Sequence, residues 1–102
     1  MDFEHFGLYE RSYNKIMDYF KTQPQIEMVK VYGSRAKGNW KEASDIDFAL
    51  FGDLTFEDIS RISGDLYELS TPYKFDVLDY ATLKHEALKE HIDRVGLVFY
   101  QK

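Results

Sequence analysis

The sequence predicts a layered α/β or α+β domain, in which helices pack on one mixed β-sheet of about four strands. Segments with the helical spacing of apolar residues alternate with short segments rich in Val, Ile, Tyr and Phe, which are typical of strands. In addition, 44% of the 102 residues are hydrophobic and 17% are aromatic, enough apolar surface for one core. We therefore expect a single domain over residues 1–102.

The first half of the chain is expected to contain one helix and two strands. Residues 8–22 are predicted to form an amphipathic helix, because apolar side chains recur there at the spacing of one helix face. These side chains are Tyr9, Tyr13, Ile16, Met17 and Phe20. Pro24 follows and stops the helix. One strand is predicted over residues 26–32 and is followed by Gly33. A second strand is predicted over residues 45–51.

The second half is expected to continue with helix, strand, helix and strand. Residues 55–69 have a helical stripe of apolar residues, formed by Ile59, Ile62, Leu66 and Leu69. Thr55 is the expected N-cap of this helix, and Asp58, three residues later, is placed to complete a capping box. The remaining elements are predicted as a strand, a helix and a strand at residues 74–79, 81–94 and 97–100.

Composition and charge exclude several classes of protein. Thirteen Lys and Arg residues against 18 Asp and Glu give a formal charge of −5, so we expect no direct nucleic acid binding. No apolar run approaches the roughly 18 residues that cross a bilayer, and the acidic start differs from a secretory signal. We therefore expect a cytoplasmic protein without a membrane partner. The absence of Cys excludes disulfides and thiolate metal sites.

The chemically informative motif is Gly33-Ser34, followed after ten residues by Asp45-Ile46-Asp47. Side chains alternate along a strand, so Asp45 and Asp47 are expected on the same face. At about 5 Å and an effective dielectric constant of about 20, their charges repel by roughly 3 kcal/mol. Such crowding favours a raised pKa or a bound cation, and carboxylate oxygens suit Mg²⁺ or Mn²⁺. Asp76, on a neighbouring predicted strand, is the candidate for a third carboxylate.

The residues after the first strand are suited to binding phosphate. Gly33 lets the backbone approach a ligand closely, and the residues after it can open a short helix whose N–H groups face an anion. The Ser34 hydroxyl and the positive charges of Arg35 and Lys37 add further donors. A triphosphate held here, beside carboxylates that bind a metal, predicts phosphoryl or nucleotidyl transfer.

Neighbouring residues allow competing interpretations. Gly33 and Gly38 have the spacing of P-loop glycines, but Asn39-Trp40 stands where the P-loop needs Lys followed by Ser or Thr, which excludes that motif. The tryptophan either covers the nucleotide or packs on the domain. Asp79 is the rival of Asp76 for the third carboxylate, but we expect Asp79 to cap the following helix.

With these motifs the sequence resembles the minimal nucleotidyltransferases of the polymerase-beta-like superfamily. The resemblance rests on the Gly-Ser motif, the Asp-x-Asp motif and the later Asp76, and it runs from about Ile26 to the C-terminus. It implies the fold of that superfamily and a metal-dependent transfer of AMP from ATP, with Mg²⁺ or Mn²⁺ as cofactor. The implied catalytic and metal-binding residues are Asp45, Asp47 and Asp76, and the nucleotide-binding residues are Gly33, Ser34, Arg35, Lys37 and Ser44.

The resemblance also implies a partner. Family members of this size are commonly antitoxins encoded beside a HEPN-domain RNase toxin, which they silence by adenylylating a Tyr. The chain is too short for a separate acceptor domain, so we expect another chain to present the acceptor, and the acidic balance favours a protein hydroxyl. Two alternatives remain: an antitoxin that blocks its partner by occlusion without catalysis, and the catalytic subunit of a two-chain nucleotidyltransferase acting on another acceptor.

Overall fold

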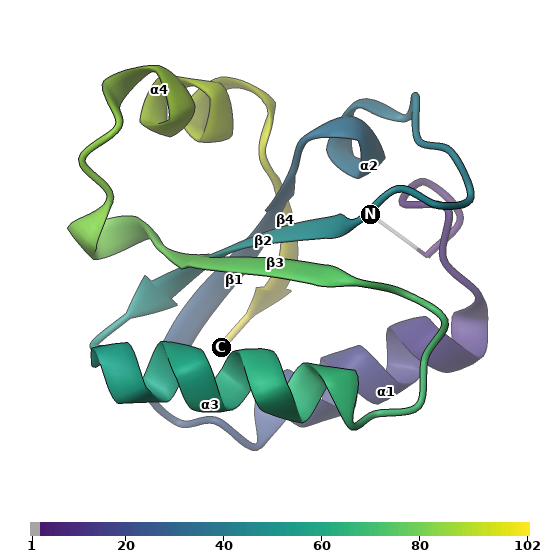
Figure 1. Ribbon diagram of the computed structural model, residues 1–102, viewed down its shortest axis with the longest axis horizontal. Helices are drawn as coiled ribbons and strands as arrows, with labels where there is room; N and C mark the ends of the chain where they lie inside the picture. Colours follow the sequence, from purple (N-terminus) through teal and green to yellow (C-terminus); the bar gives the residue numbers. More distant parts are fainter. Residues whose placement is uncertain (1–2) are drawn as a thin grey trace.

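Figure 1 shows the computed structural model, which describes residues 3–102 and contains one four-stranded mixed sheet. The strands are β1 (Ile26–Tyr32), β2 (Ile46–Gly52), β3 (Phe75–Asp79) and β4 (Leu97–Gln101). Their order in space is β3-β2-β1-β4. Strand β1 pairs antiparallel with β2 and β4, whereas β2 pairs parallel with β3. The predicted mixed sheet is thus confirmed.

Helices cover both faces of this sheet. They are α1 (Glu10–Lys21), α2 (Ser34–Lys37), α3 (Phe56–Tyr67) and α4 (Glu86–Val95), with a short 3₁₀ turn, η1 (Tyr80–Thr82), before α4. Helices α1 and α3 lie on one side of the sheet, and α2 and α4 lie on the other (Figure 1). Among the described residues, no helix combines the length and hydropathy needed to span a membrane.

The alternation of side chains along β2 gives the two faces of the sheet different characters. Ile46, Phe48 and Leu50 are fully buried in the main core, together with residues of α1 and α3. Ala49, on the opposite face, belongs to a smaller apolar cluster with residues of α4. Asp47 shares this second face, because side chains two residues apart in a strand point the same way. The α4 face therefore combines an apolar patch with carboxylates.

Most of the predicted elements are confirmed to within two residues at each end, and the capping box of α3 is confirmed in full. The Thr55 hydroxyl accepts a hydrogen bond from the Asp58 N–H at 3.1 Å, and the Asp58 carboxylate accepts one from the Thr55 N–H at 3.0 Å. These reciprocal bonds satisfy two backbone donors that would otherwise lack partners at the helix start. Burial of Ile16 and Phe20 likewise confirms the inner face of α1.

Two predictions about helix boundaries were wrong. The helix expected over residues 81–94 is divided: the Asp79 carboxylate caps η1 by accepting from the Ala81 N–H, and α4 begins only at Glu86. A second cap explains the late start, because the His85 ring nitrogen accepts the Leu88 N–H. Tyr9, expected on the inner face of the first helix, precedes α1 and is 64% exposed.

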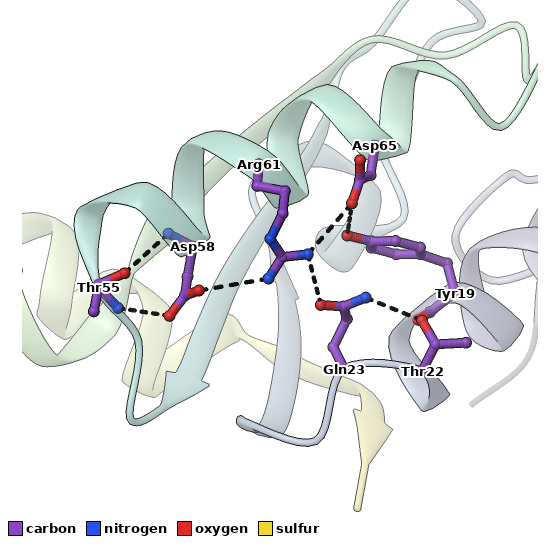
Figure 2. A network of polar contacts seen from close by, with 7 residues as sticks. All are labelled: Tyr19, Thr22, Gln23, Thr55, Asp58, Arg61 and Asp65. Atoms are coloured by element: carbon purple, nitrogen blue, oxygen red, sulfur yellow. Dashed lines mark hydrogen bonds and ion pairs between the residues drawn. The ribbon is translucent and has the colours of Figure 1, made fainter.

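Figure 2 shows a polar network that joins the C-terminal end of α1 to α3. The Tyr19 hydroxyl donates to the Asp65 carboxylate at 2.7 Å, and Arg61 donates to the same carboxylate at 3.4 Å. Arg61 also bonds Gln23, after α1, and Asp58, one turn earlier in α3. The network therefore connects two helices that are far apart in the sequence.

Replacing Tyr19 by Phe should lower the free energy of unfolding by about 1–2 kcal/mol, because a partly buried hydrogen bond to a charged group is lost. Urea unfolding followed by circular dichroism would measure the change. Tyr9→Phe, at an exposed side chain, is the matched control and should leave the midpoint unchanged. Equal midpoints for Tyr19→Phe and the wild type would show that the network contributes nothing to stability.

Candidate active site

The predicted carboxylates come together around Asp47. In the parallel β2–β3 pair, Asp47 is the direct register partner of Asp76, and in the antiparallel β1–β2 pair it is the partner of Tyr32. Asp45 lies just before the start of β2. Asp47 is half-buried, whereas Asp45 and Asp76 are exposed. The prediction that Asp76 rather than Asp79 stands beside the Asp-x-Asp motif agrees with this register.

The electrostatic crowding expected from the sequence is present. Burial, followed by the charges of Asp76 and Asp45, raises the pKa of Asp47 to about 6, and the positive charge of Arg35 offsets only part of the effect. The site thus holds like charges close enough to disfavour ionisation of the most buried carboxyl. A bound cation would reverse this penalty.

Without metal, the protein should become more stable as the pH falls from above 6 towards 4. The folded-state pKa of Asp47, about 6, lies above the ordinary value of 3.8, so the folded state binds more protons in this window. With allowance for solvent screening, we expect about 1–2 kcal/mol. Urea unfolding in a chelator at several pH values, compared with Asp47→Asn, isolates this effect. A difference between the two proteins that does not vary with pH would contradict the assignment.

Gly33 brings the backbone directly against the central carboxylate. Its φ of +75° is one that residues with a side chain rarely adopt, and a Cβ at this position would collide with Oδ2 of Asp47. Ser34 opens α2 immediately afterwards and is half-buried, whereas Lys37, at the end of α2, is exposed. The Gly-Ser motif therefore adjoins the carboxylates, as its position after the first strand predicted.

Arg35 and Ser44, which were predicted to bind the nucleotide, make contacts within the chain. The Arg35 side chain is 1% exposed, and Nη1 donates to the carbonyl oxygens of Phe6 and Gly7 at 3.0 and 3.1 Å. Its Nε and Nη2 donate to the Ser44 carbonyl oxygen at 3.1 and 2.8 Å. The Ser44 hydroxyl accepts the Lys41 N–H. Because these contacts engage the donors of Arg35, we place the candidate nucleotide site at Gly33, Ser34 and Lys37. Nucleotide binding by Ser44 stays a prediction.

Tyr32 belongs to the site, although the sequence reasoning did not single it out. It is buried, it ends β1 directly before Gly33, and its ring meets the His91 ring of α4 edge-on, with 6.2 Å between centroids. Burial, with added contributions from Asp76 and Asp47, raises the pKa of Tyr32, so the phenol keeps its proton. The antiparallel register that places it opposite Asp47 is not visible in a one-dimensional pattern.

The carboxylates are suitable ligands for a divalent metal ion, but their side chains are not arranged as a complete metal site. Within residues 3–102, no group of three or more His, Asp or Glu side chains already has the arrangement of a metal centre. The donor set is nevertheless suited to a hard cation, because it consists of carboxylate oxygens crowded around a half-buried Asp47. Binding of Mg²⁺ or Mn²⁺ by Asp45, Asp47 and Asp76 therefore stays a prediction.

Comparison with known proteins identifies the family. The family described as polymerase beta, nucleotidyltransferase matches residues 14–102. The chain belongs to this nucleotidyltransferase family. A relative from Haemophilus influenzae, named probable protein adenylyltransferase MntA, is 36% identical to it over 76 residues. That alignment covers 72% of this nucleotidyltransferase and 66% of the relative, so the chain spans about two thirds of the relative's length.

Solved structures agree with the nucleotidyltransferase fold. A crystal structure of a toxin–antitoxin with AMP-PNP superposes with a TM-score of 0.73 at 19% identity, covering 88% of this chain and 73% of the other. A tri-AMPylated HEPN toxin from Shewanella oneidensis in complex with an MNT antitoxin gives a TM-score of 0.66 at 17% identity, covering 89% and 71%. The expected polymerase-beta-like fold is thus confirmed.

Proposed function

We propose that this nucleotidyltransferase transfers AMP from ATP to a tyrosine hydroxyl of a partner protein. The partner that we propose is a HEPN-domain toxin, which the modification neutralises. The observation that carries the proposal is the in-register pair of Asp47 and Asp76, with the backbone of Gly33 against Asp47, in a chain of this family. The name of the H. influenzae relative supports a protein as the acceptor, and the toxin–antitoxin structures support a toxin as the partner.

Each residue of the site has a proposed task. Gly33 and Ser34 position the triphosphate beside Asp47, and the exposed Lys37 adds positive charge. Asp45, Asp47 and Asp76 would hold Mg²⁺ or Mn²⁺, which neutralises phosphate charge when bound.

The transfer needs one proton acceptor in the part of the site that is exposed to solvent. Asp76 is exposed there and takes the proton of the acceptor hydroxyl. The hydroxyl oxygen forms a bond to the α-phosphorus of ATP, while the bond between that phosphorus and the oxygen bridging to the β-phosphorus breaks. Pyrophosphate leaves, and the product is a tyrosine carrying AMP.

The test is an incubation with Mg²⁺, labelled ATP and the product of the neighbouring gene. Label in the α-phosphate should enter a tyrosine of that partner, whereas label in the γ-phosphate should not, because adenylyl transfer releases pyrophosphate. A partner with Phe in place of the modified Tyr is the control and should remain unlabelled. Incorporation of the γ-label instead would indicate phosphoryl transfer and would overturn the proposal.

Neutralisation by occlusion is the second candidate, because several of the similar structures are complexes of a toxin with its antitoxin. The double variant Asp45→Asn, Asp47→Asn, produced together with the neighbouring gene's product, separates the two functions. Loss of protection from toxicity would support catalysis, whereas full protection would support occlusion. A partner without RNase activity would instead favour a two-chain nucleotidyltransferase with another acceptor.

A further inference from the structure

A cavity of about 830 Å³ lies at the end of the sheet where β2 and β3 begin, and none of the three carboxylates lines it. Its walls include the rings of Tyr9, Trp40 and Tyr73. Tyr9 is 64% exposed and Trp40 is 37% exposed, so two large aromatic side chains face solvent at one place. Apolar surface that is grouped around a hollow in this way is typical of a binding site.

The charged side chains that line this aromatic cavity are negative, whereas the positive charge of Arg35 lies behind its aromatic walls. Among the described residues that line it, the charged ones are Glu4 and Glu42, and both are exposed. Neither side chain forms an ion pair with any other residue in the part of the chain that the structure describes. Aromatic faces combined with carboxylates are complementary to a guanidinium or ammonium group. The lining therefore favours a cationic occupant.

Arg35 contacts two of the aromatic rings that line the cavity. Its guanidinium carbon lies 5.6 Å from the Trp40 ring centroid and 5.0 Å from that of Tyr73. Its donors bind carbonyl oxygens of the N-terminal segment and of the loop before β2, as described above. The positive charge of Arg35 interacts with Asp45 and Asp47 on the side of the carboxylates. The aromatic walls are thus preorganised, which lowers the entropic cost of binding.

The position of the cavity connects it with the proposed reaction. Glu42 stands three residues before Asp45, and Tyr73 stands three residues before Asp76. We infer that the cavity binds an Arg- or Lys-containing segment of the acceptor protein. Binding of this segment would place the acceptor hydroxyl of the same protein beside the carboxylates. This inference rests on the proposed function for the identity of the occupant, but not for the chemistry of the cavity.

Trp40 is the single tryptophan of the chain, so its fluorescence reports on the cavity directly. The probe is a tryptophan-free peptide with two Arg residues, and its control has two Glu residues in their place. The basic peptide should change the fluorescence saturably, and the acidic peptide should not. The charge reversal Glu4→Lys, Glu42→Lys should abolish the response, whereas Glu57→Lys, Glu68→Lys, at exposed carboxylates on and beside α3, should preserve it.

The same variants also test the link with transfer. In the adenylylation assay, reversal of Glu4 and Glu42 should raise KM for the acceptor protein at least about tenfold, with kcat and KM for ATP unchanged. A rise in KM for ATP would place the nucleotide in the cavity and overturn the inference, as would a response to the basic peptide that survives the reversal. If the wild type transfers no AMP to the partner, the proposed function fails, while the peptide titration still decides the inference.

Discussion

Asp47→Asn should reduce AMP transfer by on the order of 10²- to 10³-fold, the effect typical of removing one preorganised electrostatic group from an active site. The same substitution should stabilise the metal-free protein, because it removes the central charge of a crowded carboxylate cluster. Opposite effects on activity and stability would separate a catalytic role from a structural one, since substitution of a purely structural residue lowers both.

The measurements are the rate of label incorporation at saturating ATP and the urea midpoint in a chelator. Mg²⁺ should raise the midpoint of the wild type but not that of Asp47→Asn, because a ligand that binds only the folded state stabilises it. Asp53→Asn, at an exposed carboxylate just after β2, is the matched control and should behave as the wild type. Full activity of Asp47→Asn would remove this residue from the mechanism.

Arg35→Lys should lower the free energy of unfolding by about 3–5 kcal/mol, although the charge is retained. The planar guanidinium donates to four separate backbone carbonyl groups, and an ammonium group cannot reproduce that geometry. The carbonyl oxygens of Phe6 and Gly7 would lose their common donor, and buried polar groups without partners are costly.

Urea unfolding measures this loss, and Arg94→Lys is its control, because Arg94 pairs with Glu90 on the surface of α4. Exposed ion pairs contribute little, so the control should change the midpoint only slightly. If Arg35→Lys no longer unfolds cooperatively, Arg35→Met will show whether the missing hydrogen bonds or the buried ammonium is responsible. Arg35→Lys with the midpoint of the wild type would contradict the structural role.

The sequence predicted the sheet and the carboxylates well, because both depend on local patterns. Strand β1 was placed at its exact ends, and the expected crowding is present, because burial and the charges of Asp76 and Asp45 raise the pKa of Asp47. Asp76 was chosen from its place on a neighbouring predicted strand, in agreement with the family motif, and the parallel register places it beside Asp47. These features require only spacing along the chain and the order of the strands.

Features that depend on contacts between distant segments were not predicted. Arg35 was expected to bind phosphate, but its partners include the N-terminal carbonyls of Phe6 and Gly7, about 30 positions earlier. The spacing of apolar residues along the sequence does not predict a contact between such distant segments. Tyr9 was expected inside the core because its spacing fits the helix, yet the helix begins after it. The cavity that Tyr9 shares with Trp40 arises from these same long-range contacts.

The contacts of Arg35 have a practical consequence for where the folding unit begins. The family match starts at residue 14, but two of the carbonyl groups that bind the guanidinium belong to residues before that point. A shortened chain cut to the matched region would remove the His5 ring that is hydrogen-bonded to the Ala36 carbonyl oxygen. It would also leave the buried Arg35 guanidinium without two of its acceptors. Domain boundaries drawn from family similarity alone would therefore remove a segment that the remaining polypeptide needs in order to stay folded.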